Sequence, residues 1–252
     1  MAKILTKTLV IGLSTVAALS VNVSAHADDL DNDKDLRLGC PVTYAQLKSA
    51  VTQAAQADTT GLDNDYWAVV VNRSGNVCAV AYSGPTIDSQ WLASRQIAAA
   101  KAFTANGLSL NLPKGPLSTA QLYGFVQPSP SGGNPLYGLQ FGNEQNAKRA
   151  YQGDYNAFGT ERDPLVGARI GGTITFGGGL ALYNGSNVVG GLGLSGDTAC
   201  ADHSTAWRTR TILGMVGPGT DTIPLTNGAT PTTGGHPRCP NDTGTQGQAT
   251  SS

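Results

Sequence analysis

The sequence predicts an α+β domain in which helices pack on a central antiparallel sheet. Two segments with the alternation and turn residues of β-hairpins lie far apart in the chain, near residues 66–82 and 174–194. Segments with helical periodicity and capping residues precede, separate and follow them. Hairpins pair antiparallel strands, and the helices between them must cover the faces of the resulting sheet.

The helices are predicted from capping residues that stand before apolar periodic segments. The expected helices are one from Thr43, with Gln46 completing a capping box, to before Gly61; one from Asp88 to about Ala105, with Asn106-Gly107 as its stop; a short one from Ser118, boxed by Gln121, towards Phe125; and one from about Ala199 to Leu213, capped by Thr198 or Asp197.

The strands are predicted from alternation and from turn dipeptides. The expected strands are 66–71 and 77–82 around a turn at 72–76, one or two strands between Ile174 and Leu182 around a glycine bend, and 188–194 after the Asn184-Gly185 turn. Between the hairpins, residues 127–143 form a long Pro- and Gly-rich loop, which in a compact domain is usually functional or flexible.

The first 27 residues have the three parts of a secretory signal peptide. Two lysines make a positive n-region, residues 9–19 form an uncharged apolar stretch, and Ala25-His26-Ala27 fits the cleavage pattern. The apolar stretch is shorter than the about 20 residues that a membrane-spanning helix needs. We therefore expect a periplasmic or extracellular protein with no integral membrane segment after cleavage.

Composition divides the rest of the chain into three regions. We expect an acidic flexible segment at 28–39, one domain at 40–216, and a Pro-, Gly- and Thr-rich tail at 217–252 that is pinned near Cys239. After removal of the signal, 14 basic residues stand against 17 acidic ones, a net charge of −3. Such a chain has no basic field for nucleic acid.

Four cysteines remain after the signal, and an even number in an exported chain predicts two disulfides. Their pairing is open, since four cysteines allow three connectivities. No two have the spacing of a zinc ribbon or of covalent haem attachment. The candidates are Cys40, Cys78, Cys200 and Cys239.

The motifs of common hydrolases are missing from the sequence. It contains neither H-E-x-x-H nor G-x-S-x-G. Gly191, Gly193 and Gly196 match a dinucleotide fingerprint, but no βαβ unit follows. A nucleophilic pair of Cys78 and His203 is disfavoured because Cys78 is expected in a disulfide. No catalytic residue is assigned.

His203 is the one histidine inside a predicted helix. An imidazole can bind a metal ion or haem iron, and the nearby Arg208 can meet a haem propionate. The alternative is an ordinary solvated histidine on the helix surface. His236, in the tail, is a weaker candidate.

Four more side chains are candidates for a pocket. Tyr137 and Gln140 lie in the glycine-rich loop, where Tyr137 can line an apolar cavity, offer a phenolate to iron or simply anchor the loop. Arg95 and Lys101 lie on the alanine-rich second helix, either as pocket cations or on its solvated face.

Several blocks in the chain have a recognisable pattern. They are LSTA (117–120), LYGLQF (136–141), GTERDPLVG (159–167), RIGG (169–172), FGGGLALY (176–183), GGLGLSGDTACADH (190–203), AWR (206–208) and GHPRC (235–239). These blocks resemble the extracytoplasmic branch of the haem-binding GlcG/HbpS-like family, over roughly residues 40–240.

The resemblance implies an α/β sandwich with a central antiparallel sheet, assembly into homo-oligomers, and haem or a related tetrapyrrole as ligand. Since ligand residues vary in the family, His203 as axial ligand is our inference from its chemistry. Three functions are therefore expected: an exported protein that buffers, senses or relays haem; an enzyme of this fold that degrades haem or acts on a small organic acid; or a structural or partner-binding subunit of an oligomer.

Overall fold

The computed structural model describes residues 39–128, 134, 136–141, 143–225 and 235–241. The predicted signal peptide, nearly all of the acidic segment and parts of the 127–143 loop and of the tail lie outside these residues. The proposed domain boundaries therefore stay predictions.

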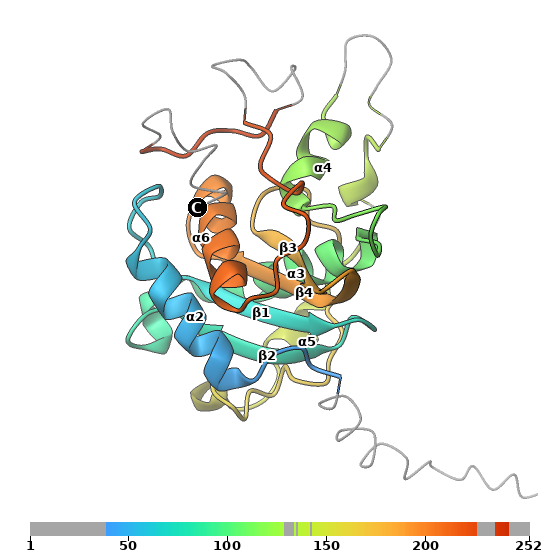
Figure 1. Cartoon of the computed structure of the whole chain (residues 1–252). Coiled ribbons are helices and arrows are strands. Elements are labelled where there is room, and N and C mark those ends of the chain that lie inside the picture. The colour runs from blue at the N-terminus through green and yellow to red at the C-terminus, as the bar shows by residue number, and fades with distance from the viewer. Residues whose placement is uncertain (1–38, 129–133, 135, 142, 226–234, 242–252) are drawn as a thin grey trace, which may run out of the picture.

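Four strands form one antiparallel sheet in the order β2-β1-β4-β3 (Figure 1). The strands are β1 (Trp67–Asn72), β2 (Val77–Tyr82), β3 (Gly179–Asn184) and β4 (Asn187–Ser195). Both hairpins predicted from the sequence are present, and β1 pairs with β4 to join them. Every residue of β1 is buried, because both faces of this central strand are covered.

The α-helices are α2 (Tyr44–Gln56), α3 (Leu92–Leu108), α4 (Thr119–Val126), α5 (Ala147–Ala150) and α6 (Ala199–Ile212). Three of the predicted N-caps are confirmed. The side chains of Thr43, Ser118 and Thr198 accept hydrogen bonds from the backbone three residues further on. The first two form complete capping boxes with their glutamines.

The predicted limits of the second helix are wrong at both ends. Asp88 belongs to a separate 3-10 turn, and α3 starts at Leu92 without a side-chain cap. At the other end α3 continues through Asn106 and Gly107 to Leu108. Tertiary packing on the sheet overrides the local stop signal there, because Asn106 is buried against β4 and holds Arg73 by hydrogen bonds.

The strand expected to begin near Ile174 starts only at Gly179. Residues 177 and 178 instead pass close to α6: a side chain at Gly177 would place its Cβ 2.2 Å from the Ala199 carbonyl oxygen. Gly178 has a φ of +115°, which glycine adopts without steric cost. The glycine bend therefore packs against α6 just before β3, and the Gly178 carbonyl oxygen accepts from the Leu194 N–H of β4.

The molecule has three layers (Figure 1). Helices α2 and α6 cover one face of the sheet, where Leu47, Val51 and Trp207 pack on alternate strand residues. Helix α3 and the segment 150–170 cover the other face around Trp67 and Val69. The predicted α+β class, a central antiparallel sheet packed by helices, is confirmed.

The glycines of β4 allow α3 to lie directly on the strand backbone. A Cβ at Gly193 would stand 2.0 Å from the Ala98 carbonyl oxygen, and one at Gly191 would stand 2.3 Å from that of Ala102. The role of these glycines is to let the helix pack closely on the strand. Within the described residues, no helix is long and apolar enough to cross a membrane.

Candidate functional site

His203 lies in the second turn of α6 and is completely buried. The expectation of a solvated surface histidine is therefore wrong. Its Cβ stands beside Gly177, and its ring is 6.2 Å from the Trp207 ring. Neither ring nitrogen has a hydrogen-bond partner of acceptable geometry, although the Asp221 backbone lies close enough to favour protonation. Burial is the main cause that lowers the pKa of His203 far below its usual range, so the imidazole is neutral.

Two segments of the tail cross α6 near His203. We call these segments, residues 217–225 and 235–241, the C-terminal strap. They meet where the backbone N–H of His236 donates to the Pro224 carbonyl oxygen at 2.7 Å, and Leu225 and His236 form a parallel bridge. Asp221 and His236 contribute to the electrostatic surroundings of His203, so the strap lies against this side chain.

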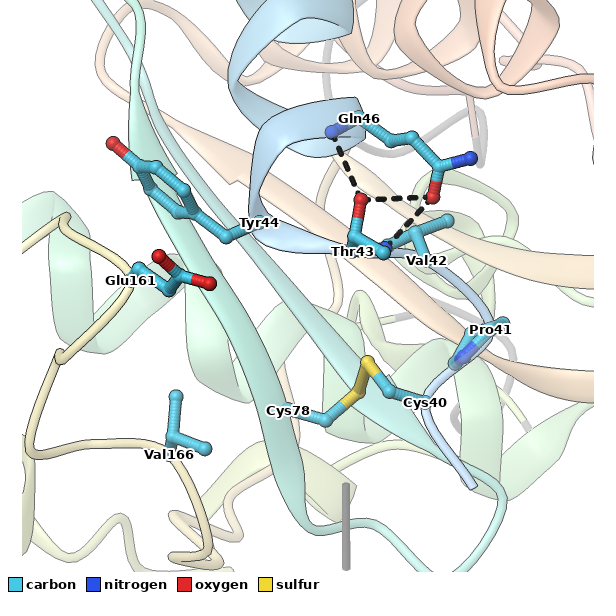
Figure 2. Close-up of a pocket in the computed structure, with 9 residues that line it drawn as sticks. All are labelled: Cys40, Pro41, Val42, Thr43, Tyr44, Gln46, Cys78, Glu161 and Val166. Atoms are coloured by element: carbon cyan, nitrogen blue, oxygen red, sulfur yellow. Dashed lines mark hydrogen bonds between the residues drawn. A yellow bond between two sulfur atoms is a disulfide. The ribbon is translucent and has the colours of Figure 1, made fainter. Parts of the chain in front are cut away.

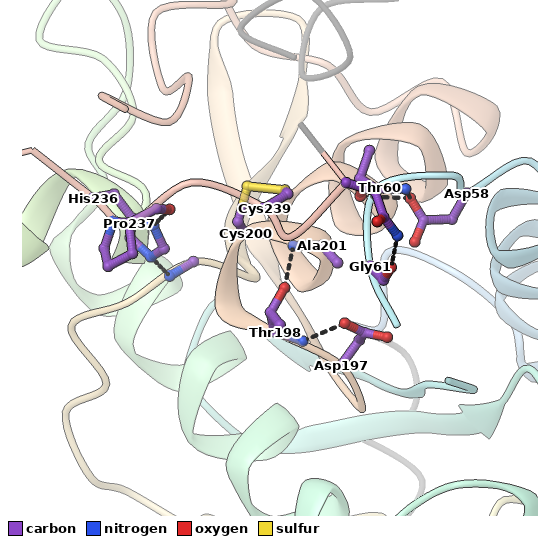
Figure 3. Close-up of a disulfide and its surroundings, with 12 residues drawn as sticks. Asp58, Thr60, Gly61, Asp197, Thr198, Cys200, Ala201, His236, Pro237 and Cys239 are labelled. Atoms are coloured by element: carbon purple, nitrogen blue, oxygen red, sulfur yellow. Dashed lines mark hydrogen bonds between the residues drawn. A yellow bond between two sulfur atoms is a disulfide. The ribbon is translucent and has the colours of Figure 1, made fainter. Parts of the chain in front are cut away.

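The strap is fastened to the domain at several places, and Figure 3 shows those at Cys239 and His236. Cys239 forms a disulfide with Cys200, at the start of α6. The Asp221 carboxylate accepts two hydrogen bonds, of 2.5 and 2.9 Å, from the buried guanidinium of Arg210. His236 accepts a 2.9 Å hydrogen bond at Nε2 from the Gly177 backbone N–H. The tail is thus pinned at Cys239, as its cysteine suggested.

Lys101 and Asp202 form a buried ion pair next to His203. The Lys101 Nζ lies 2.5 Å from the Asp202 Oδ2 and also donates to the Leu194 carbonyl oxygen. Burial lowers the pKa of Lys101 and raises that of Asp202 to about 6, while each partner's charge opposes the shift of the other. Asp202 further accepts from the backbone N–H groups of Gly196 and Asp197, which fixes the β4–α6 turn.

Arg95, on the same helix α3 as Lys101, forms a second buried ion pair. Its guanidinium meets the Asp163 carboxylate in a bidentate contact, with both N–O distances at 2.5 Å, and stacks over the Phe158 ring. Asp163 also accepts from the backbone of Gly159 and Leu165. Neither Arg95 nor Lys101 is on a solvated face, and both have their charge satisfied within the core.

The predicted site residues do not gather in one place. Arg208 of α6 forms an ion pair with Asp58, which follows α2 in the chain, at an N–O distance of 3.1 Å. Tyr137 is 57% exposed, in the turn that follows Asn134. Gln140 is half-buried, and its Oε1 has no hydrogen-bond partner. Only Lys101 and His203 lie in one neighbourhood.

A largely apolar pocket of about 500 Å³ lies between α4 and the strap. Phe125 and Gly124 of α4 form one side and Pro224 of the strap another. Asn134 also lines it, and the next turn is held by the Leu136 backbone N–H, which donates to the Phe125 carbonyl oxygen. Tyr137 follows in this turn, where its backbone N–H donates to the Asn134 carbonyl oxygen.

The other disulfide, Cys40–Cys78, ties the start of the described domain to β2. It lines a smaller pocket of about 280 Å³ with Tyr44 and Glu161 (Figure 2). The four cysteines are thus all paired, as expected, and neither sulfur of this bond is available as a thiol. Within the described residues, no cluster of three or more potential ligands could hold a metal ion.

Sequence reasoning missed the carboxylates that neutralise the buried cations. No spacing in the sequence links Asp163 to Arg95 or Asp221 to Arg210, since each pair joins different elements. It also underrated His236, which is buried against Tyr123 with the rings 5.1 Å apart. The GHPRC block around His236 was the available signal.

Two solved structures and one family model are similar to this chain. Klebsiella pneumoniae protein ORFY is 24% identical over 70% of this chain and 92% of its own, with a TM-score of 0.45. The structure of a PduOC:haem complex is 25% identical over 67% of this chain and 89% of its own, with a TM-score of 0.42. No curated protein sequence matches.

The family model described as haem degrading protein HbpS-like matches residues 43–209, from the cap of α2 to the last turns of α6. The chain belongs to the HbpS-like family of haem-degrading proteins.

Proposed function

We propose that this protein is an exported haem-binding protein that buffers, senses or relays haem. The observation that carries the proposal is the family match over residues 43–209. The signal-peptide pattern of residues 1–27 supports export, and two disulfides are compatible with an oxidising compartment.

The volume and the mainly apolar lining of the pocket between α4 and the strap support it as the place where a ligand binds. Ligand pockets measure roughly 300–1,000 Å³ and are mainly apolar. Its walls at Leu117, Phe125 and Pro224 are apolar. Tyr137 is hydrogen-bonded through its backbone to the lining residue Asn134, and its exposed side chain has a phenol oxygen that can bind iron. When bound, haem supplies an iron centre for ligand exchange and electron transfer.

The buried cations do not fit a role in binding propionates. Arg95 and Lys101 are already paired with carboxylates inside the core, and moving either would leave a buried charge without its partner. Arg208 is partly exposed but pairs with Asp58. We therefore propose Tyr137 as the ligand of the iron, since His203 is completely buried in this structure.

A hemin titration followed by absorbance tests this function. The protein, expressed with its complete sequence and purified, is expected to develop a Soret band that saturates at a fixed stoichiometry. Tyr137→Phe removes only the phenol oxygen and should shift the band and weaken binding, whereas the matched Tyr155→Phe, on another surface, should not. Absence of any spectral change with hemin refutes the proposal.

Haem degradation is the second candidate, because the matching family is described by that activity. In this case the Soret band of the hemin complex should decay with time when a reductant or peroxide is added, in proportion to the protein present. A stable band under both conditions supports binding without turnover. Light scattering with and without hemin tests the expected homo-oligomer.

A further inference from the structure

A separate pocket of about 500 Å³ lies where the loop after α3 meets the turns of both hairpins. The Leu112 backbone N–H donates to the Ser186 carbonyl oxygen, and the Val188 backbone N–H donates to the Asn111 Oδ1, both at 2.9 Å. Because both bonds reach backbone groups of the β3–β4 hairpin, the loop is held in place against it. The pocket is therefore already formed in the free protein, as most ligand sites are.

The lining of this pocket contains two cations, Arg73 and Lys114, and no carboxylate. The buried cations Arg95, Lys101 and Arg210 each have a carboxylate partner in the core. In the part of the chain that the structure describes, by contrast, neither Arg73 nor Lys114 forms an ion pair. The positive charge of the pocket is thus available to an anion from solution.

Arg73 is held in position by neutral groups that leave its charge uncompensated. Its Nη1 donates to the backbone oxygen of Asn106 and to the Asn106 Oδ1, the latter at 3.0 Å, and its Nη2 donates to the Ser109 carbonyl oxygen at 3.2 Å. A guanidinium has five N–H donors, so these three contacts leave donors for another partner. Since the side chain is already ordered, an anion that binds it does not have to immobilise it.

The rest of the lining is apolar or neutral. It consists of Leu110, Leu112, Pro113 and Val188, with the amides of Asn111 and Asn187. Leu110 is 49% exposed, so a ligand that covers it gains the free energy of removing apolar surface from water. A molecule with one anionic end and an apolar body matches both parts of the lining. A carboxylate suits the anionic end because its plane and two oxygens match the geometry of a guanidinium.

We propose that this pocket binds a small organic carboxylate with an apolar body, such as an aromatic or medium-chain aliphatic acid. Arg73 and Lys114 hold the carboxylate, and the leucines of the loop contact the body. The site differs from the pocket between α4 and the strap, with which it shares no lining residue. It does not depend on haem, so each of the two proposals can fail without the other.

Isothermal titration calorimetry with 2-naphthoate tests the ligand class on the complete chain in the absence of hemin. The matched ligand, 2-naphthamide, has nearly the same shape but no charge. We expect saturable binding of one naphthoate per chain, weakened by added salt, and affinity for the amide that is lower by about tenfold or more. Absence of saturable naphthoate binding, or equal affinity for the two ligands, overturns the proposal.

Two variants locate the site. Lys114→Met keeps the apolar stem of the side chain but removes the charge, and should weaken naphthoate binding about fivefold. Arg73→Gln should weaken it by about tenfold or more, because hydrogen bonds to a charged group are lost. Lys148→Met removes an exposed charge from α5 and is the matched control, with wild-type affinity expected.

Circular dichroism checks the folding of each variant, and if Arg73→Gln does not fold, Lys114→Met decides alone. Unchanged affinity in Lys114→Met places the naphthoate elsewhere and refutes the site. An equal loss in Lys148→Met shows a general effect of net charge, which refutes it as well.

Discussion

Protonation of His236 is expected to loosen the C-terminal strap as the pH falls. In the folded protein its Nδ1 donates to the Pro237 carbonyl oxygen at 2.8 Å, and its Nε2 accepts from Gly177 at 2.9 Å. A proton on Nε2 would face the Gly177 N–H and break this contact. Burial is the main cause that lowers the pKa of His236 to about 4.

The sign and size of the effect follow from this shift. Because the folded pKa lies below the unfolded value of about 6.5, the unfolded chain binds the proton more tightly. The stability that His236 contributes is therefore complete above pH 6.5 and is lost as the pH falls towards 4. Integration of the linkage relation gives a loss of about 2 kcal/mol between pH 7 and pH 5, and about 3 kcal/mol by pH 4.

Urea unfolding at several pH values, with both disulfides intact, measures this loss. His236→Gln keeps a donor and an acceptor but does not titrate. Between pH 7 and pH 5, its free energy of unfolding should therefore fall by about 2 kcal/mol less than that of the wild type. Thr43→Ala, destabilised at the cap of α2, is the control and should keep the wild-type slope. Parallel slopes for wild type and His236→Gln would refute the reasoning.

Three further changes test the packing. Lys101→Met leaves the Asp202 carboxylate buried without its cation and should cost about 3–5 kcal/mol in denaturant unfolding; wild-type stability would show that the pair is not desolvated. Gly193→Ala places a Cβ 2.0 Å from the Ala98 carbonyl oxygen, so α3 must shift and the loss should be about 3 kcal/mol, with altered near-UV circular dichroism; an unchanged spectrum would contradict this contact. Ser118→Ala should cost about 1 kcal/mol at α4, measured by thermal unfolding; an unchanged melting temperature would argue against the cap.

Local signals in the sequence predict the elements of this fold well. The capping boxes at Thr43 and Ser118 and the Asn184-Gly185 turn depend on residues close together in the chain, so pattern alone identifies them. The late end of α3 and the late start of β3 depend on contacts with β4 and α6. Such contacts join residues that are distant in sequence and have no local signature.

The candidate site was harder to predict for the same reason. Arg95 and Lys101 stand among alanines on a helix that would seem half-solvated, yet their carboxylate partners lie 68 and 101 residues away. The glycines of β4 bring α3 so close that its polar side chains are enclosed. Cysteine number and the signal pattern did predict disulfides, although only the structure assigns their pairing.

The order of the two disulfides along the chain affects how the protein can be made. Cys40 pairs with Cys78, and Cys200 with Cys239, so neither loop encloses a cysteine of the other bond. A chain emerges from synthesis or export with its N-terminus first, and the first two cysteines are exposed to oxidant well before the third appears. Oxidation in this order favours the native pairing, and we expect oxidative folding of the protein to need little help from a disulfide isomerase.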